Sequence, residues 1–244
     1  MSGLVLSLFP GLDLLGRAFE AEGFCVVRGP DVIFGQDIRS FHPPAGRFDG
    51  VIGGPPCQCF SRLANIVRAN GYEPKFGNLI PEFERVVTEA APAWWLMEEV
   101  PDAPIPGVHG YQQEVFTLSP RHLGDVQSRL RRFTVGGHHR PTIYNRLPMV
   151  ALEAAEYEFA ATGGSRTRPV AIGGSGKRKG GGQLPGNGKS MRSLADLARC
   201  QGYPELAEVL PGPWTVAGAC KAIGNGVPAV MGRSLARAIK EWQG

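Results

Sequence analysis

Short apolar runs that end at glycine or proline alternate with helical patterns in the first half of the chain, and this alternation constrains the fold most. Residues 4–9 are an apolar run that ends at Pro10-Gly11, and apolar residues at helical spacing follow over 12–22. The same reasoning predicts strands at 24–27, 47–54, 94–97, 115–118 and 133–135, and a helix over 80–90. Strands that alternate with helices predict an α/β fold with a doubly wound, mostly parallel, Rossmann-like sheet, whose ligands bind at the carboxyl ends of the strands.

The regular alternation stops after residue 137, which predicts three segments. Residues 1–137 are expected to form the α/β domain, residues 138–211 a small irregular second lobe, and residues 212–244 a segment that returns to the first domain. Within the small lobe, Ser193 is expected to open a helix, with Asp196 as its capping-box partner. Apolar residues at helical spacing over 229–242 predict a last helix that packs on the α/β domain.

The composition is that of an ordinary globular protein. A chain of 244 residues with 43% hydrophobic and 20% charged residues fits one or two domains. It has no run of about 18 apolar residues and no export signal over 1–10, so we expect a cytoplasmic protein without membrane contact. The five cysteines are scattered and form no CxxC pair, which argues against a disulfide framework and against a structural metal.

Positive charge concentrates in one glycine-rich window, residues 163–192. This window holds seven basic residues, no acidic residue and ten of the 34 glycines, whereas the rest of the chain has 19 basic and 22 acidic residues. A segment of this composition cannot bury a core. It is either a solvated loop between packed elements or a flexible segment that meets a polyanion such as nucleic acid.

The most informative segment is Gly-Gly-Pro-Pro-Cys-Gln-Cys-Phe-Ser over 53–61. Two glycines and two prolines after an apolar strand predict an exposed, rigid turn with Cys57 at its tip, where a thiolate could act as a nucleophile. Taken alone, the pattern is also compatible with a cysteine that has no reactive role. Cys59 is the second candidate, one step further into the following segment.

This segment resembles the nucleophile motif of the C5-specific cytosine DNA methyltransferases, and the other motifs of that family follow in order. They are found at 8–11, 36–38, 78–87, 97–101, 127–131, 199–204 and 223–228. The resemblance therefore extends over nearly the whole chain. The small size is similar to that of solitary members from phages or prophages.

The resemblance implies a DNA (cytosine-5)-methyltransferase that uses S-adenosylmethionine. Cys57 would add to C6 of a cytosine flipped out of the duplex, and Glu98 would hold or donate a proton at N3. Arg129 and Arg131 are expected on one strand and on the same face, where they would bind the base O2 and position neighbouring groups. Loss of the C5 proton and elimination of Cys57 would release 5-methylcytosine.

The resemblance also implies which residues bind the cofactor and double-stranded DNA. The cofactor-binding candidates are Phe9, Gly11, Asp13, Asp31, Asp37, Ile38, Pro56, Leu79, Asn225 and Val227. The DNA-binding candidates are Gln58, Ser61, Arg62, Arg68, Gln127, Lys177, Arg178 and Lys179. Without the motif order, the apolar cofactor candidates would be core residues of any α/β fold. We expect the protein to act as a monomer.

The chain departs from the family pattern at three places. Asp13 stands at the second glycine of the Phe-x-Gly-x-Gly turn, and Ser7 replaces the acidic residue before Phe9. Glu99 replaces the asparagine of Glu-Asn-Val, and a second carboxylate there needs a basic partner or a raised pKa. The region expected to recognise the target is also short, so base readout is minimal or is made largely by the basic window.

Three functions stay open at the level of sequence. The first is an active DNA cytosine methyltransferase, which the retention of Cys57, Glu98 and both motif arginines favours. The second is a degenerate homologue that binds DNA or cofactor without turnover, which Asp13 and Glu99 motivate. The third is the same mechanism on RNA, or with a modified S-adenosylmethionine donor.

Overall fold

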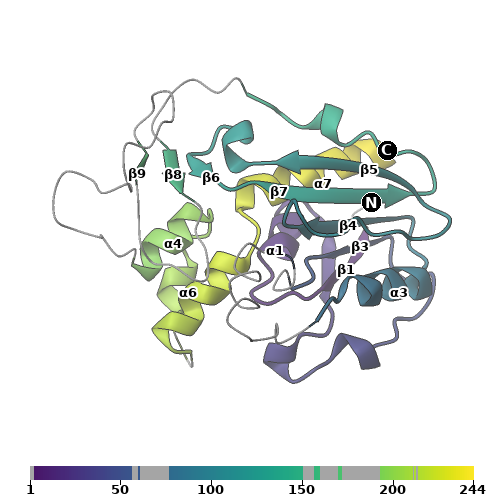
Figure 1. Ribbon diagram of the computed structural model, residues 1–244, viewed down its shortest axis with the longest axis horizontal. Coiled ribbons are helices and arrows are strands. Elements are labelled where there is room, and N and C mark those ends of the chain that lie inside the picture. The colour runs from purple at the N-terminus through teal and green to yellow at the C-terminus, as the bar shows by residue number, and fades with distance from the viewer. Residues whose placement is uncertain are drawn as a thin grey trace.

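A six-stranded sheet is the centre of the structure (Figure 1). The computed structural model describes residues 3–56, 60, 77–150, 157–159, 170–171, 193–210, 212 and 214–244. The sheet has the order β2-β1-β3-β4-β7-β5. Its strands are β1 (Leu4–Leu8), β2 (Cys25–Arg28), β3 (Gly50–Gly53), β4 (Trp94–Glu99), β5 (Gln112–Leu118) and β7 (Arg131–Gly137). The first four strands in this order are parallel, and β7 runs antiparallel to both β4 and β5, which confirms the predicted mostly parallel α/β fold.

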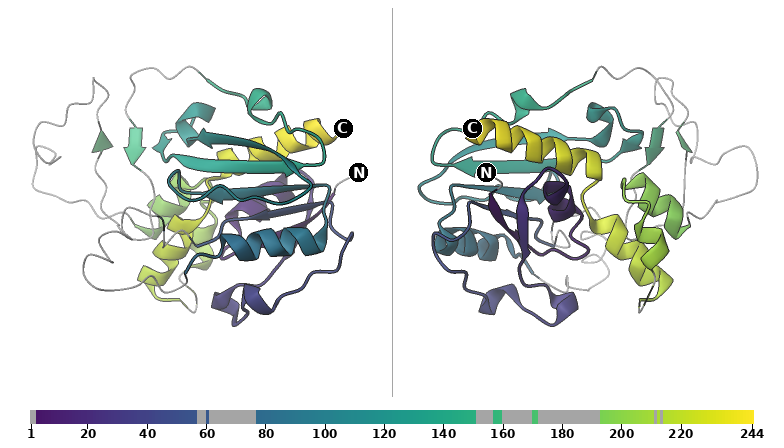
Figure 2. Two further views of the ribbon diagram at one scale, coloured as in Figure 1. Left: turned by 45° about the vertical axis from the view of Figure 1, so that its right-hand side comes forward. Right: turned by 180° about the vertical axis from the view of Figure 1, so that it is seen from behind.

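Helices cover both faces of the sheet, and the alternation of side chains along each strand explains why (Figure 2). Val5, Ile52 and Leu96 point to the face that α1 (Leu14–Ala21) and α7 (Ala229–Gln243) cover. Their chain neighbours point to the other face, which α3 (Ile80–Ala90) covers. A strand buried on both faces must be apolar at every position, which accounts for the continuous apolar runs in the sequence.

The C-terminal part adds a helical layer beside the sheet. Its helices are α4 (Leu194–Cys200), α5 (Leu206–Val209) and α6 (Val216–Asn225), and they share a third apolar cluster with Leu14 of α1. The Tyr203 hydroxyl donates to the carbonyl of Leu14 at 2.6 Å. A small sheet of β6 (Gln127–Ser128), β8 (Tyr157–Phe159) and β9 (Val170–Ala171) lies on the same side of the molecule (Figure 1).

The predicted elements are present, with shifts at their ends. The capping box of Ser193 and Asp196 is formed, and the last helix begins at Ala229 as predicted. Helix α6 was not expected, because its sequence is rich in small residues and gives a weak apolar pattern. Ile143 and Leu147, near the start of the predicted small lobe, pack in the same cluster as the strands, and the boundaries of the three segments stay a prediction.

Among the described helices, none combines the length and the apolar character that a membrane crossing requires.

The close contact of β7 with β4 gives a stability prediction. A Cβ atom at Gly136 would lie 2.2 Å from the fully buried Trp95 ring, so Gly136→Ala should lower the free energy of unfolding by about 1–3 kcal/mol. Gly107→Ala is the control, since a Cβ there meets no atom within 4 Å. Urea unfolding of the two variants measures the difference. Equal stabilities would contradict the tight packing of Trp95.

Candidate active site

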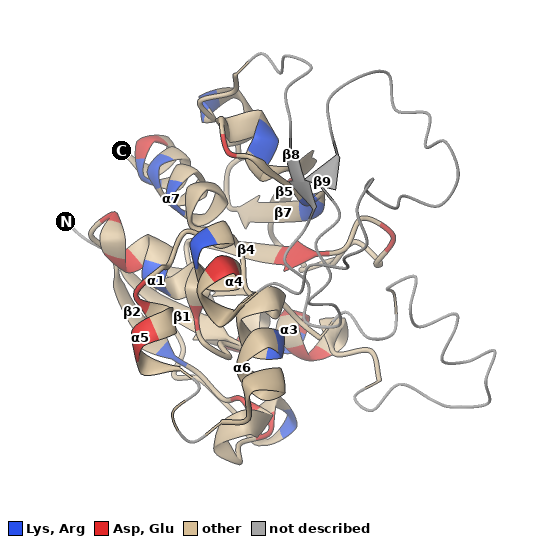
Figure 3. Cartoon of the chain, turned by 90° about the vertical axis from the view of Figure 1, so that its left-hand side faces the viewer, with Lys and Arg blue, Asp and Glu red and all other residues tan. Residues whose placement is uncertain are grey.

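Four parallel strands bring their carboxyl ends to one edge of the sheet, which we call the carboxyl edge. The residues that follow β1, β2, β3 and β4 there are Phe9–Asp13, Gly29–Asp31, Gly54–Pro56 and Val100. Strand β7 is antiparallel and therefore begins at this edge, with Arg131. Figure 3 views the molecule from the side on which these ends lie, with Asp and Glu in red and Lys and Arg in blue.

Glu98 and Arg131 form an ion pair at the carboxyl edge. The distance from Arg131 Nε to Glu98 Oε1 is 2.9 Å, and both side chains are largely buried. The other carboxylate oxygen, Oε2, lies beside Gly54, where a Cβ would come within 3.0 Å of it. The carboxylate is therefore next to the turn Gly54–Pro56, which leads to Cys57.

Glu99 lies in the protein interior, with 1% of its surface exposed. Its Oε2 accepts a hydrogen bond from the Val100 amide at 2.8 Å. Burial and the charge of Glu98 raise the pKa of Glu99 to about 8, although Arg132 and Arg131 act in the opposite direction. At neutral pH the Glu99 carboxyl is mostly protonated, and it is then uncharged, as is the asparagine amide of the family motif.

Arg132 fixes the loop after β4, and the sequence reasoning missed it. Its Nη1 donates to the carbonyl of Pro101 at 3.0 Å and to that of Ala103, and its Nη2 donates to the carbonyl of Pro104 at 2.7 Å. Burial lowers the pKa of Arg132. The signal in the sequence is a third arginine directly after the Gln-x-Arg-x-Arg motif.

Two predictions for the Gln-x-Arg-x-Arg motif require correction. Arg129 precedes β7, so it does not share a strand with Arg131; it is 3% exposed, and its Nη1 donates to the carbonyl of Gly224 at 2.7 Å. Gln127 is fully buried and donates to the carbonyl of Cys200 at 2.7 Å. A buried side chain offers no surface to DNA, so the predicted DNA contact of Gln127 is replaced by a structural one that joins β6 to α4.

The β1–α1 turn contains three of the predicted cofactor residues. Phe9, Gly11 and Asp13 all adopt positive φ angles, of 55°, 56° and 55°. The Gly11 amide donates to Asp31 Oδ2 at 2.9 Å, which ties the end of β1 to the end of β2. Asp31 also caps the short 3-10 turn η1 (Val32–Phe34) by accepting from the Ile33 amide at 2.9 Å.

The remaining predicted cofactor residues divide into buried and exposed ones. Ile38 and Leu79 are buried in one apolar cluster, and Phe9 packs against it. Asp37 is exposed and pairs with Arg39, whose hydrogen bonds lower the pKa of Asp37. Val227 lies in the cluster of α1 and α7, while Asn225 ends α6 at the surface.

Arg85 of α3 is a second residue that sequence reasoning missed. Its Nη2 donates to the carbonyls of Ile38 at 2.8 Å and Phe41 at 3.1 Å, while Glu82 and Glu89 pair with its other nitrogens. Arg85 therefore fixes the 3-10 turn η2 (Ile38–Ser40) against α3. The signal in the sequence was an arginine at helical spacing between two glutamates.

Several predicted residues lie outside the described residues. They are Cys57, Gln58, Cys59, Ser61, Arg62, Arg68, Lys177, Arg178 and Lys179. Pro56 is described and ends the segment that begins with β3.

The described part of the carboxyl edge fits a nucleoside cofactor. A Cβ at Gly11 would meet open space, so the turn leaves room above its backbone. Each Asp31 oxygen accepts one backbone hydrogen bond and keeps a further lone pair that can accept from a hydroxyl group. Three consecutive apolar residues follow, of which Phe34 is 61% exposed, and such surface suits a heterocyclic ring. Within the described ranges, no group of His, Cys, Asp and Glu has the arrangement of a metal site.

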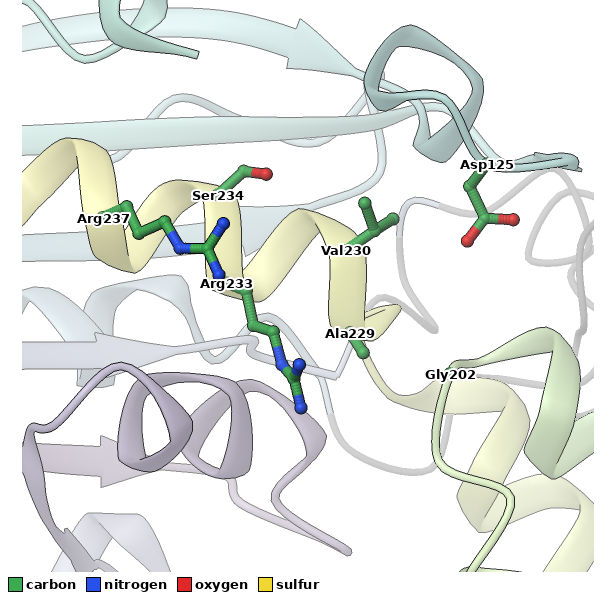
Figure 4. Close-up of a pocket in the computed structure, with 7 residues that line it drawn as sticks. All are labelled: Asp125, Gly202, Ala229, Val230, Arg233, Ser234 and Arg237. Atoms are coloured by element: carbon green, nitrogen blue, oxygen red, sulfur yellow. The ribbon is translucent and has the colours of Figure 1, made fainter. Parts of the chain in front are cut away.

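A pocket of about 300 Å³ lies along α7 (Figure 4). Arg233 and Arg237 project from α7 beside it, and Asp125 lies at its other end. Glu22 holds Arg237 through two hydrogen bonds of 2.8 Å. None of the residues predicted to bind cofactor or DNA lines this pocket, so it is separate from the candidate site.

Comparisons with known sequences find similar proteins for part of the chain. Residues 33–103 match the family described as C-5 cytosine-specific DNA methylase. The chain is 32% identical over 99 residues to Type II methyltransferase M.HgiDI of Herpetosiphon aurantiacus, which covers 36% of this chain and 31% of that protein. It is 26% identical over 152 residues to Type II methyltransferase M.NgoPII of Neisseria gonorrhoeae, and this match covers 55% of this chain and 40% of that protein. The matches thus span between 31% and 40% of the length of these curated relatives.

Solved structures match the fold over its whole length. The Entamoeba histolytica methyltransferase EhMeth matches with a TM-score of 0.65 and 12% identity, over 99% of this chain and 98% of that one. A putative DNA modification methyltransferase encoded within an Escherichia coli prophage matches with a TM-score of 0.60 and 16% identity, over 99% of both chains. The chain therefore has the Rossmann-like fold of these methyltransferases.

The matched residues include several of the motifs found in the sequence. Residues 33–103 contain the η2 turn, β3 with the turn that follows it, α3 and β4 with Glu98. Residues 33–103 are similar to the C-5 cytosine-specific DNA methylases, and this match and the Type II methyltransferase relatives support the resemblance found in the motifs.

The raised pKa of Glu99 predicts a pH dependence of stability. An unfolded glutamate loses its proton near its ordinary value of 4.5, whereas folded Glu99 keeps it up to about 8. The free energy of unfolding therefore falls as the pH rises between these values, by at most about 1.4 kcal/mol for each pH unit. Glu99→Gln should remove this contribution. The stability of the variant relative to the natural chain should therefore be higher at pH 8 than at pH 5.

Urea unfolding of Glu99→Gln and the natural chain at both pH values measures the effect. Glu208→Gln, which changes an exposed carboxyl of α5, serves as the control and should follow the natural chain. The same pH slope in Glu99→Gln and the natural chain would show that Glu99 titrates at its ordinary value.

Proposed function

We propose that this protein is a DNA (cytosine-5)-methyltransferase. The observation that carries the proposal is the Glu98–Arg131 pair, which lies at the carboxyl edge beside the turn that leads to Cys57. A nucleophile next to a buried, hydrogen-bonded carboxyl group is the combination that activation of a cytosine ring requires. The family match includes both β3, which precedes the nucleophile, and β4, which ends in Glu98 and Glu99.

The cofactor would be held along the ends of β1 and β2 and by η2. In this proposal Phe9 and Gly11 line the methionine side, and Asp31 accepts hydrogen bonds from the ribose hydroxyls. Ile38, with Asp37 beside it, and Leu79 flank the adenine, and Pro56, Asn225 and Val227 complete the pocket. When bound, S-adenosylmethionine supplies the methyl group that C5 of the cytosine accepts.

The side chains of this protein would carry the other steps. The Cys57 thiolate forms a bond to C6 of the flipped base, and the ring electron pair moves to C5 while Glu98 holds a proton at N3. Arg131 orients the Glu98 carboxyl group through their ion pair. A base from the solvent then takes the C5 proton, the C5–H electron pair re-forms the C5–C6 double bond, and the bond between Cys57 and C6 breaks, which releases the thiolate with 5-methylcytosine as the product.

The substrate in this proposal is double-stranded DNA, bound on the side where the helices α4 and α6 flank the carboxyl edge (Figure 1). Residues 138–211 would form the target recognition lobe, with the basic window 163–192 meeting phosphates. The segment with Gln58, Ser61, Arg62 and Arg68 would close on the flipped base. We propose a monomer that acts in the cytoplasm.

The structure weakens the reasons for a degenerate homologue. The raised pKa of Glu99 leaves that carboxyl uncharged, and Asp13 accepts hydrogen bonds from β1 and α1 and forms an ion pair with Arg28 of β2. Neither residue leaves an uncompensated charge at the carboxyl edge. An active enzyme is therefore the proposal that the geometry supports best.

The test is a direct assay for the product. The purified protein is incubated with S-adenosylmethionine and unmethylated DNA of mixed sequence, and modified cytosines are measured by mass spectrometry, with RNA in a parallel reaction. We expect 5-methylcytosine in the DNA. A folded protein that modifies no base would contradict the proposed activity, and product in RNA alone would contradict the DNA substrate.

The catalytic assignments are tested by substitution in the same assay. Cys57→Ser should abolish the product, because a serine hydroxyl is a far weaker nucleophile at neutral pH, while cofactor binding persists. Cys59→Ser is the matched control and should keep the activity. Glu98→Gln should lower the rate by about 10²- to 10⁴-fold. If Cys59→Ser is the more damaging change, the nucleophile is wrongly assigned.

A further inference from the structure

The turn between β1 and α1 is held in an unfavourable backbone conformation. Phe9 and Asp13 are not glycines, yet both lie in the left-handed region. Side chains rarely adopt this region, since the left-handed conformation costs about 1–2 kcal/mol for each residue. Two such residues within one short turn require interactions that hold them in place.

The Asp13 carboxylate provides these interactions from three elements. Its Oδ1 accepts from the Ser7 hydroxyl of β1 at 2.7 Å and from the Gly16 amide of α1 at 3.1 Å. Its Oδ2 pairs with Arg28 Nε of β2 at 2.9 Å. The side chain is 2% exposed, and burial raises its pKa while Ser7 and Arg28 act in the opposite direction.

The absence of a side chain at Gly16 leaves room for this carboxylate. A Cβ at Gly16 would lie 2.2 to 2.5 Å from the carboxylate atoms of Asp13, a distance that no side chain can occupy. The first turn of α1 therefore accepts the carboxylate as its N-cap only because residue 16 has no side chain. Asp13 and Gly16 form one structural unit with Ser7 and Arg28.

We propose that Asp13 is a positioning residue, which holds Phe9 and Gly11 in the conformation that binds the cofactor without contacting the cofactor itself. This inference rests on the proposed function and corrects the sequence-based expectation that Asp13 is a cofactor ligand. Both carboxylate oxygens are engaged inside the protein, and the residue has almost no accessible surface. The Asp13 amide in turn donates to the carbonyl of Pro10 at 2.6 Å, which closes the turn around Gly11.

The pairing of β1 with β2 offers a way to move the carboxylate without losing it. Ser7 lies directly opposite Arg28 in the parallel register, and its hydroxyl already contacts the Asp13 carboxylate. An acidic side chain at position 7 would thus reach the same space beside Arg28, while glycine at position 13 accepts the positive φ angle without cost. The double variant Ser7→Asp with Asp13→Gly should therefore keep the turn in its binding conformation.

The first test is thermal unfolding, which needs no cofactor. Gly16→Ala should lower the Tm of the natural chain, because the new methyl group meets the Asp13 carboxylate. In the Asp13→Gly background the same change should raise the Tm, since alanine is the better helix former and nothing obstructs it. A Tm that falls equally in both backgrounds would contradict the proposal that Asp13 and Gly16 form one structural unit.

The second test is calorimetric binding of S-adenosylmethionine and S-adenosylhomocysteine. Asp13→Asn keeps an N-cap and tolerates the left-handed region but loses the charge that pairs with Arg28, and Asp13→Gly loses the side chain altogether. We expect both to raise Kd by about tenfold or more, with KM for the donor rising more than kcat falls. The double variant Ser7→Asp with Asp13→Gly should recover most of the binding.

The matched control is Glu20→Gln, which removes only the exposed partner of Arg28. Its Kd should equal that of the natural chain. An unchanged Kd in Asp13→Asn and Asp13→Gly would overturn the positioning role, and so would a double variant that binds no better than Asp13→Gly. If the natural chain binds neither compound, the proposed function itself fails, and the positioning role fails with it.

Discussion

Parallel pairing of four neighbouring strands is the constraint on which the candidate site depends. Because β2, β1, β3 and β4 run in one direction, the residues that follow them meet at a single edge of the sheet. The antiparallel strand β7 then returns to that edge and begins there with Arg131, opposite the acidic end of β4. Residues far apart in the sequence thus form one site, and no long-range loop is needed to assemble it.

Charge is compensated locally along the carboxyl edge. Arg28 pairs with Asp13 at 2.9 Å, Arg131 pairs with Glu98 at 2.9 Å, and Glu99 avoids a charge through its raised pKa. A buried carboxylate without such compensation would cost several kcal/mol, so each departure from the family pattern is coupled to a neighbour. Asp13 is coupled to Ser7 and Gly16 in the same way.

The sequence predicts the parts of this structure that local patterns encode. Apolar runs locate the strands, and the capping box of Ser193 locates α4, because both signals lie within a few residues. Helix α6 was not predicted, because its packing on α4 stabilises it rather than a strong apolar pattern in its own sequence. The burial of Gln127 and Arg129 depends on contacts with residues 73 and 95 positions away, which no local pattern reports. The left-handed conformation of Asp13 is likewise set by partners in other elements.

We propose that the carboxyl edge of the sheet binds the cofactor. Hydrogen exchange measured by mass spectrometry, with and without S-adenosylhomocysteine, tests it most directly. We expect slower exchange over residues 9–16 and 29–40 in the presence of the compound, and unchanged exchange over 230–240, where Val230, Arg233, Ser234 and Arg237 line the pocket along α7. Protection over 230–240 with no change at the two strand ends would contradict it.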